Sequence, residues 1–175
     1  QLDTKALEAM MGPDVGLIAI TWIPTNGGLV NPAAEVGRIA RKHNVPYLLD
    51  ACQAAGQVRI DVEALGCDFL SVTARKFLRG PRGIGFLYVS KRQLETIEPA
   101  MIDFFGAPWT SRNAYTLRPD ARRFENWENA YALRAGLSTA MTYADQIGID
   151  AIEARVAQLG TFCADAVGAL PGVTS

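Results

Sequence analysis

Two short apolar runs between residues 46 and 89 constrain the fold more than any other feature of this chain. Residues 47–49 read Tyr-Leu-Leu and stop at Asp50, and residues 69–72 read Phe-Leu-Ser-Val and stop at Thr73. Each run has the length and composition of a buried strand. In an open parallel sheet, ligands bind beyond the carboxyl ends of the strands. The polar residues that follow the two runs are therefore expected to converge on one crevice.

The residues at these two strand ends suggest a particular chemistry. Thr73, Arg75 and Lys76 follow the second run, and Asp50 follows the first. A neighbouring cation and partial desolvation favour the neutral lysine amine, which is the nucleophile in Schiff-base chemistry. Pyridoxal 5'-phosphate (PLP) needs such a lysine for its aldehyde, an acid for its ring nitrogen and donors for its phosphate. The simpler interpretation is an aspartate that caps the next turn and a surface lysine in a basic loop.

The sequence around these residues resembles one enzyme family. Asp50-Ala-Cys-Gln53, followed by Thr73-Ala-Arg75-Lys76-Phe-Leu-Arg-Gly-Pro-Arg-Gly-Ile-Gly-Phe-Leu-Tyr-Val, resembles class V aminotransferases. This is the fold type I PLP-dependent group that includes cysteine desulfurases, selenocysteine lyases and isopenicillin N epimerase-like enzymes. The resemblance runs from about residue 18 to the end of the chain. It implies the three-layer α/β fold of the large domain of PLP-dependent transferases, in which helices flank a mostly parallel sheet.

The resemblance also implies a role for each site residue. Lys76 takes the position of the Schiff-base lysine, and Asp50 that of the aspartate that pairs with the pyridinium nitrogen. Gln53 matches the glutamine that hydrogen-bonds the phenolic oxygen of the cofactor, and Thr73 matches the phosphate-binding Ser or Thr. Arg75 replaces the histidine that is common before the lysine in desulfurases. Because arginine is a strong bidentate phosphate partner, this change keeps the phosphate role and weakens the desulfurase assignment.

A third loop follows another apolar run, residues 15–23, and reads Pro-Thr25-Asn26-Gly27-Gly28. The two glycines allow the backbone to approach a ligand closely, although a plain turn explains them equally well. In the resembling family this loop carries a polar residue near the cofactor and the substrate. Thr25 and Asn26 are both candidates for that role.

The rest of the chain alternates between helix and strand patterns. Helices are expected over residues 2–11, 33–43, 62–65, 91–97, 130–147 and 151–170, and a further strand over residues 84–89. Side chains suited to capping precede four of these helices, namely Asn31, Asp61, Ser90 and Asp150. The glycines of residues 80–83 are interpreted as turn residues, with Arg79 and Arg82 as anion contacts.

Residues 99–124 have weak periodicity and several helix breakers. A loop this long inside a domain is usually functional or part of an interface. Phe104, Phe105 and Trp109 would be costly to expose, so they are expected to pack against a partner subunit or within the chain itself. Many desulfurases have, at the place of Asn126 and Trp127, a Gly-Thr pair that reaches the neighbouring subunit's cofactor phosphate. The resemblance therefore implies a homodimer in which that contact is replaced.

Composition narrows the class of protein further. With 175 residues, 49% hydrophobic and 20% charged, the chain is expected to form one compact domain. A net charge of -1 gives no broad basic surface for nucleic acid. The sequence has no apolar run of the roughly 18 residues that a membrane span needs. A single histidine argues against a metal centre.

The cysteines and the chain length give two more expectations. Cys52, Cys67 and Cys163 are an odd number with no disulfide-like spacing, so they are expected to be packing residues in a reducing, cytoplasmic protein. The chains of the resembling family are about twice as long. Residues 1–175 are therefore expected to be the central part of the PLP-binding large domain, without its N-terminal part and without the C-terminal small domain.

Three functional hypotheses follow. The first is a PLP-dependent enzyme acting on a small-molecule amino acid through a Lys76 Schiff base, most like a class V aminotransferase, with a cysteine desulfurase or other carbon-sulfur lyase as the alternative. The second is a catalytically silent α/β binding or assembly module, since a fold alone does not prove function. The third is a nucleotide-binding domain, which ranks last because both the Gly-x-Gly-x-x-Gly and Gly-Lys-Ser/Thr patterns are absent from the sequence.

Overall fold

The computed structural model describes residues 2–173. The strands are β1 (Ile18–Thr21), β2 (Tyr47–Asp50), β3 (Phe69–Thr73), β4 (Gly85–Val89), β5 (Trp109–Ser111) and β6 (Ala114–Tyr115). The helices are α1 (Thr4–Ala9), α2 (Ala33–Lys42), α3 (Val62–Leu65), α4 (Lys91–Leu94), the 3-10 helix η1 (Ala121–Phe124), α5 (Tyr131–Ile147) and α6 (Ile149–Gly168). Most expected elements are present, and α1 and α4 are shorter than the sequence pattern predicts.

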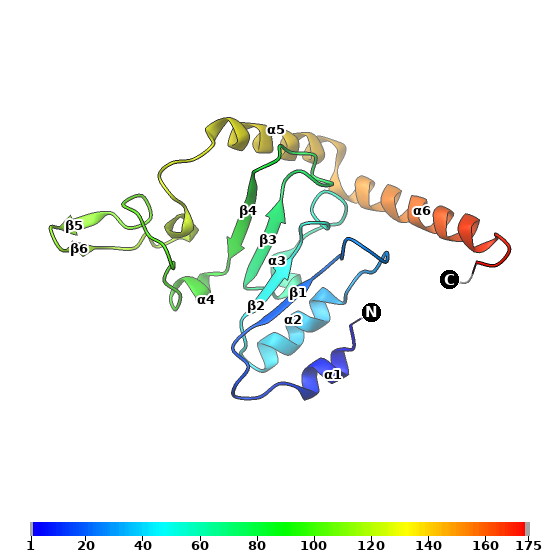
Figure 1. Cartoon of the computed structure of the whole chain (residues 1–175), viewed down its shortest axis with the longest axis horizontal. Coiled ribbons are helices and arrows are strands. Elements are labelled where there is room, and N and C mark those ends of the chain that lie inside the picture. The colour runs from blue at the N-terminus through cyan, green and yellow to red at the C-terminus, as the bar shows by residue number, and fades with distance from the viewer. Residues whose placement is uncertain (1, 174–175) are drawn as a thin grey trace.

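Four strands form the central sheet in the order β1-β2-β3-β4 (Figure 1). The pairs β1–β2 and β2–β3 are parallel, and β4 runs antiparallel to β3. The connections between the parallel strands contain α2 and α3, whereas β3 and β4 are joined by residues 74–84, a loop without a helix. Parallel neighbours need a long crossover connection, usually a helix, so a loop without one fits the antiparallel pairing of β4 with β3. The expected α/β fold with a mostly parallel sheet is confirmed.

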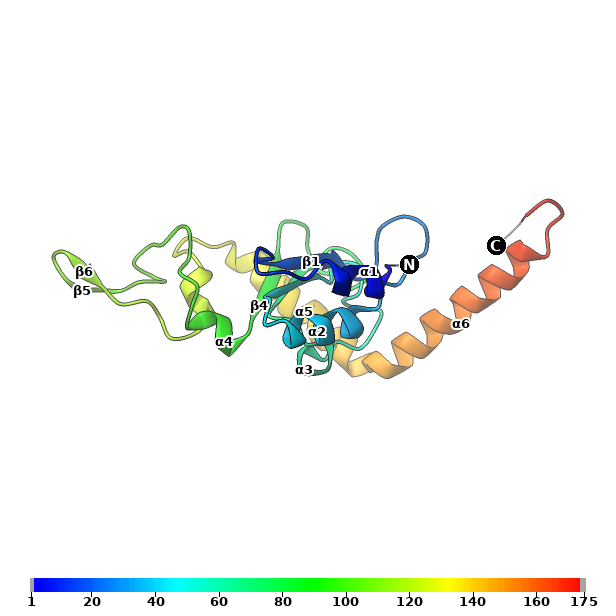
Figure 2. The ribbon, with the colours of Figure 1, turned by 90° about the horizontal axis from the view of Figure 1, so that it is seen from below.

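One face of the sheet carries the core. Alternate residues of β2 and β3 are buried, including Tyr47, Leu49 and Leu70, and the residues between them are half-buried. Helices α2, α3 and α5 lie on the same side of the strands, below them in Figure 2. The fully buried side chains of Val36 and Ala40 on α2 pack in this layer. The period of two along the strands thus separates a covered face from a more open one.

Of the four side chains expected to cap helices, only Asp61 does so. The Asp61 carboxylate accepts the backbone N–H groups of Glu63 and Ala64, both at about 3 Å, at the start of α3. The prediction for Asn31 is wrong, because its side-chain amide donates to the Thr21 carbonyl oxygen at 2.8 Å and Pro32 is the residue that precedes α2.

The two remaining cap predictions fail for the same reason, since each side chain has a partner outside its helix. The Ser90 hydroxyl precedes α4 but donates to the Asp68 carboxylate at 2.9 Å. Helix α6 begins at Ile149, before Asp150, and the Asp150 carboxylate accepts from the Arg59 guanidinium at 2.9 Å. A cap prediction from sequence misses such partners because they are distant in the chain.

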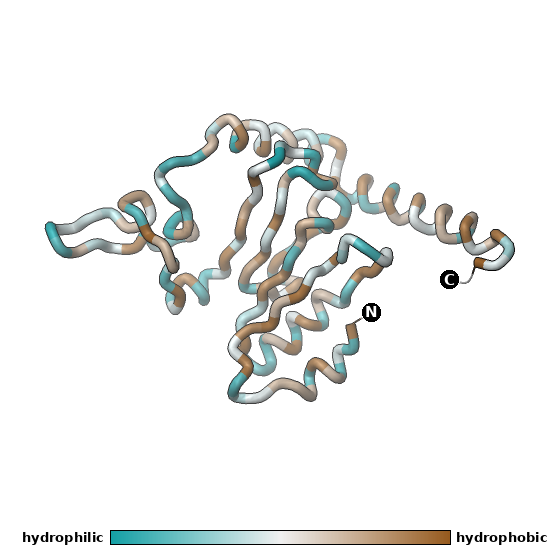
Figure 3. The backbone as a smooth tube through the Cα atoms, viewed as in Figure 1, coloured by the Kyte–Doolittle hydropathy of each residue, from teal (hydrophilic) through white to brown (hydrophobic). Residues whose placement is uncertain are grey.

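The segment expected to be a long loop contains a projecting hairpin. Strands β5 and β6 pair with each other and extend away from the sheet, and α6 extends from the other side (Figures 1 and 3). The Trp109 side chain on β5 is 77% exposed, and none of the side chains of α6 is buried. The accessible surface is 11390 Å², whereas a compact monomer of this mass exposes roughly 8,300 Å². The chain has one hydrophobic core, and the excess surface fits the projection of the hairpin and of α6 from it.

The cysteines differ in their surroundings. Cys67 is buried and Cys52 is half-buried, which fits a packing role, but Cys163 is exposed on α6 and the packing prediction is wrong for it. Within residues 2–173, no helix is both long and apolar enough to cross a membrane. The same residues include no group of three or more His, Cys, Asp or Glu side chains arranged to hold a metal ion.

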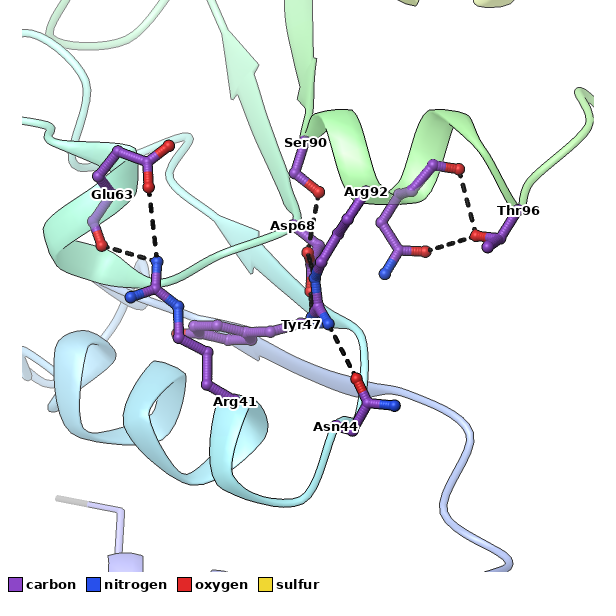
Figure 4. Close-up of polar contacts among 9 residues, drawn as sticks. Arg41, Asn44, Tyr47, Glu63, Asp68, Ser90, Arg92 and Thr96 are labelled. Carbon is purple, nitrogen blue, oxygen red and sulfur yellow. Dashed lines mark hydrogen bonds and ion pairs between the residues drawn. The ribbon is translucent and has the colours of Figure 1, made fainter.

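A buried carboxylate, that of Asp68, lies just before β3 and contacts Tyr47 at the start of β2 and Ser90 just after β4 (Figure 4). The Asp68 side chain is 4% exposed and forms an ion pair with the Arg92 guanidinium. It also accepts the Tyr47 backbone N–H at 3.0 Å and the Ser90 hydroxyl at 2.9 Å. Burial alone would raise the pKa of Asp68, but Arg92, Tyr47 and Ser90 together hold this pKa below its usual value.

Replacing Asp68 with asparagine is expected to lower the free energy of unfolding at neutral pH by about 1–3 kcal/mol, since a buried charged hydrogen bond is lost. Because the folded-state pKa is depressed, the carboxylate contributes stability above its unfolded pKa of about 3.9 and loses it as the pH falls further. The difference between the parent and Asp68→Asn should therefore shrink below about pH 4. Urea unfolding at several pH values measures this difference in the free energy of unfolding. The control is Asp165→Asn, since Asp165 is exposed on α6. A constant difference at all pH values would contradict the role of the charge.

Candidate active site

The carboxyl ends of β1, β2 and β3 lie at the same edge of the sheet. Thr21, the last residue of β1, is paired with Asp50, the last residue of β2. Asp50 is in turn paired with Ser71, and β3 continues to Thr73. The parallel pairing places these chain ends side by side, as the sequence pattern predicts.

Asp50 is half-buried and uses both of its oxygens. One carboxylate oxygen accepts the Cys52 backbone N–H at 2.9 Å, which is the turn-capping contact of the simpler interpretation. The other accepts the Thr21 hydroxyl at 3.4 Å, a long hydrogen bond that leaves this oxygen weakly engaged. Thr21 was not anticipated, although its position at the end of β1 is the same signal that points to Asp50 and Thr73.

The Cys52 thiol lies beside this carboxylate. Burial, and then the hydrogen bond and negative charge of Asp50, raise the pKa of Cys52. The thiol also contacts the Ser71 carbonyl oxygen at 3.8 Å. The direction of this pKa shift and the half-buried position of the thiol fit the packing role that the sequence predicts for Cys52.

Gln53 connects the turn after β2 to the loop after β1. Its side-chain amide donates to the Thr25 hydroxyl at 3.0 Å, and its backbone carbonyl accepts from Gln57 at 2.6 Å. Thr25 and Asn26 are both exposed. Within residues 2–173, Asn26 has no side-chain hydrogen bond, so of the two candidates only Thr25 contacts another site residue.

The loop after β3 presents three of the candidate residues. Thr73 and Lys76 are half-buried and Arg75 is exposed. In the part of the chain that the structure describes, none of these three side chains forms a hydrogen bond or an ion pair. Their donors are thus available to a ligand.

The backbone of this loop is closed on itself. The Gly80 N–H donates to the Ala74 carbonyl oxygen at 2.8 Å, and the Arg79 N–H donates to the Lys76 carbonyl oxygen at 2.9 Å. Gly56 packs against the outside of the loop, where a Cβ atom would lie 2.5 Å from the backbone of Phe77. Only glycine fits this contact, and its φ of 88° also favours glycine.

Lys76 also lines a groove of about 390 Å³ between the loop and the junction of α5 and α6. The loop contributes Phe77 and Arg79 to the same groove, and the helices contribute apolar side chains that include Ile147 and Ile152. Asp50 and Gln53 do not line it. The structure therefore brings the candidate residues to one edge of the sheet without any direct contact between Lys76 and Asp50.

The fold and this edge define an α/β protein with a polar site beyond the carboxyl ends of parallel strands. The chain belongs to the class-V aminotransferase family, whose model matches residues 1–175. It is 32% identical to a probable cysteine desulfurase of Halalkalibacterium halodurans, over 96% of this chain and 41% of that protein.

Solved structures agree with this assignment. The cystine C-S lyase C-DES, in complex with its product cysteine persulfide, superposes with a TM-score of 0.87 at 27% identity, over 96% of this chain and 46% of that one. The apo cysteine desulfurase of Thermococcus onnurineus gives a TM-score of 0.82 at 28% identity, over 95% and 42% of the two chains. A lysine-to-alanine variant of C-DES carries glycine covalently linked to its PLP cofactor. The chain spans less than half the length of these relatives.

Proposed function

We propose that this chain is the cofactor-binding core of a PLP-dependent enzyme that acts on an amino acid. One observation carries the proposal. A carboxylate, an amide, a hydroxyl, a guanidinium and a primary amine follow parallel strands at one edge of the sheet, in Asp50, Gln53, Thr73, Arg75 and Lys76. This set of donors and acceptors suits the ring nitrogen, phenolic oxygen, phosphate and aldehyde of PLP.

Each side chain has a distinct task in this proposal. PLP, when bound, supplies an electron sink for a carbanion at the substrate. Asp50 holds a proton at the ring nitrogen, and Gln53 donates to the phenolic oxygen. Thr73 and Arg75 bind the phosphate, and Arg75 does so with a bidentate guanidinium. Thr25, held by Gln53 at 3.0 Å, and Asn26 border the substrate side.

Lys76 holds the cofactor and moves the proton. Its amine would hold the cofactor through the aldehyde, and the free amine would take or return the α proton of the substrate. Its half-buried position and its lack of a carboxylate partner among the described residues leave the amine able to do both.

The reaction type is the second part of the proposal. Transamination is the first candidate, since the family model is that of class-V aminotransferases and Arg75 stands where desulfurases commonly have histidine. Carbon-sulfur cleavage is the second candidate, and the names of the relatives favour it. An assay of the intact protein against cysteine, its sulfoxides and 2-oxo acids separates the two reactions. Release of sulfide or persulfide indicates carbon-sulfur cleavage, and transfer of the amino group to a 2-oxo acid indicates transamination.

The binding experiment is a titration of the intact protein with PLP. We expect a visible absorption band that borohydride removes, and mass spectrometry should then locate the reduced adduct on the peptide that contains Lys76. A protein without the band would support the silent binding module. Nucleotide-dependent thermal stabilisation would instead support the nucleotide-binding alternative.

We further propose that the protein is a homodimer in the cytoplasm. Three unpaired cysteines support a reducing compartment. The projecting segment supports the dimer, because an isolated two-stranded hairpin is only marginally stable in water. Aromatic residues that precede and follow the hairpin in the chain form a cluster, in which the Trp127 ring centroid lies 4.9 Å from that of Phe104 and 5.9 Å from that of Phe105. Aromatic residues are enriched in interface cores, which supports an interface on this side of the molecule.

Replacing Trp109 with serine is expected to weaken the dimer by roughly 30-fold or more, as the loss of an aromatic hot spot does. Sedimentation of the intact protein over a range of concentrations measures the dissociation constant. Phe162→Ser on α6 is a matched control, since Phe162 is 71% exposed and Trp109 is 77% exposed. Equal effects of the two variants, or a monomeric parent, would contradict an interface at the hairpin.

A further inference from the structure

We propose that Arg79 and Tyr143 form a latch that positions Lys76, an inference that rests on the proposed function. The starting observation is a strained backbone. Arg79 has a φ of 61°, in the left-handed region that a bulky side chain rarely adopts. Such outliers persist only where the surrounding structure imposes them, and they gather at functional sites.

The contacts of Arg79 show what imposes this conformation. Its backbone N–H donates to the Lys76 carbonyl oxygen at 2.9 Å, so the turn that closes at Arg79 begins at Lys76. Its guanidinium lies over the Tyr143 ring on α5, 5.1 Å from the ring centroid. Within residues 2–173, no carboxylate forms an ion pair with Arg79. The aromatic face is therefore the partner that fixes the charged end of this side chain.

The next residue closes the loop. The Gly80 N–H donates to the Ala74 carbonyl oxygen at 2.8 Å, and a Cβ atom on Gly80 would lie 2.8 Å from the Ala74 side chain. A left-handed residue at position 79 turns the chain so that this close approach is possible. An ordinary φ at Arg79 would move Gly80 away from Ala74 and open the loop that carries Lys76.

The latch joins two elements that are far apart in sequence. Tyr143 lies on α5, and the groove beside Lys76 is bordered by the junction of α5 and α6. Because Arg79 spans from the loop to α5, the direction of Lys76 is set relative to that helix and not by the loop alone. Arg79 is thus a positioning residue, which acts through Lys76 and touches no reacting atom.

Three variants separate the parts of the latch. Arg79→Asn removes the guanidinium but keeps a residue that tolerates a positive φ, so the fold is retained. Tyr143→Leu removes the aromatic face, and Tyr143→Phe keeps it and serves as the conservative control. Each is made in the intact protein.

The first measurement is hydrogen exchange without cofactor. Arg79 and Tyr143 are both exposed, so loss of their cation–π contact is expected to speed exchange of the Arg79 and Gly80 amides by roughly twofold to fivefold in Arg79→Asn and Tyr143→Leu. The amides of β3 should exchange as in the parent, and Tyr143→Phe should match the parent throughout. Unchanged exchange in both loss variants would overturn the latch.

The second measurement follows PLP binding in the same proteins. The rate of covalent attachment to Lys76 and the circular dichroism of the visible band should both fall in the two loss variants and recover in Tyr143→Phe. Faster loop exchange with unchanged attachment and dichroism would overturn the positioning role. A parent protein that does not attach PLP would overturn the proposed function, and hydrogen exchange would show that failure to be separate from the latch.

Discussion

Replacement of Lys76 with alanine is expected to abolish borohydride-trapped attachment of PLP and to lower turnover by roughly 10²- to 10⁴-fold, the usual contribution of a positioned general base. The expectation follows from the position of the amine at the end of β3, half-buried and without a carboxylate partner among the described residues. The alanine variant should still bind PLP weakly, because the side chains assigned to the ring and the phosphate are unchanged.

Lys91→Ala is the matched control for this experiment. Lys91 is exposed at the start of α4, on a different part of the chain from the candidate site. It should keep the trapped adduct and the turnover of the parent. An unchanged adduct in Lys76→Ala, or its loss in Lys91→Ala, would show that another amine holds the cofactor and would remove Lys76 from the site.

Replacing Gly37 with alanine is expected to lower the free energy of unfolding by about 2–3 kcal/mol, because the added methyl group overpacks a tight contact. Gly37 lies in α2, where glycine is normally less favourable than alanine by about 1 kcal/mol. Here a Cβ atom would lie 2.0 Å from the Leu65 carbonyl oxygen of α3, so the two helices would have to separate. Helix propensity alone predicts that alanine stabilises this position, whereas close packing makes the substitution destabilising.

Gly160→Ala gives the comparison. Gly160 lies in α6 with no atom within 4 Å of its would-be Cβ atom, so alanine should stabilise the helix by up to about 1 kcal/mol. Urea unfolding of both variants beside the parent measures the two changes. If Gly37→Ala also raised the free energy of unfolding, the contact between α2 and α3 would be looser than described.

Elements could be predicted from the sequence where the local residue pattern and the packing in the fold agree. The runs before Asp50 and Thr73 are strands, and their ends meet at one edge, because apolar runs of this length in an alternating helix-strand pattern favour a parallel sheet. Asp61 caps α3 as predicted, since its partners lie within three residues. The donors that the chain offers a ligand could thus be named from sequence, and their roles remain predictions.

Features that depend on distant residues could not be predicted. The Ser90 hydroxyl donates to Asp68 and not to its own helix, and the Thr21 hydroxyl donates to Asp50 on the neighbouring strand. The strained φ of Arg79 has no sequence signature, because arginine is not a residue that favours this region. Each case requires knowledge of which elements become neighbours, and that knowledge comes only with the fold.

The order of strands in the sheet has a consequence for how the site forms. Strands β1, β2, β3 and β4 are neighbours in space in the same order as in the chain, so each new strand can join the edge of the sheet as synthesis proceeds from the N-terminus. The ends of β1 and β2, with Thr21 and Asp50, can pair first. The loop with Lys76 takes its shape only when β4 has added and the Ala74 N–H has met the Ile84 carbonyl oxygen. The conformation of the Lys76 loop thus depends on a strand that lies later in the chain than the lysine itself.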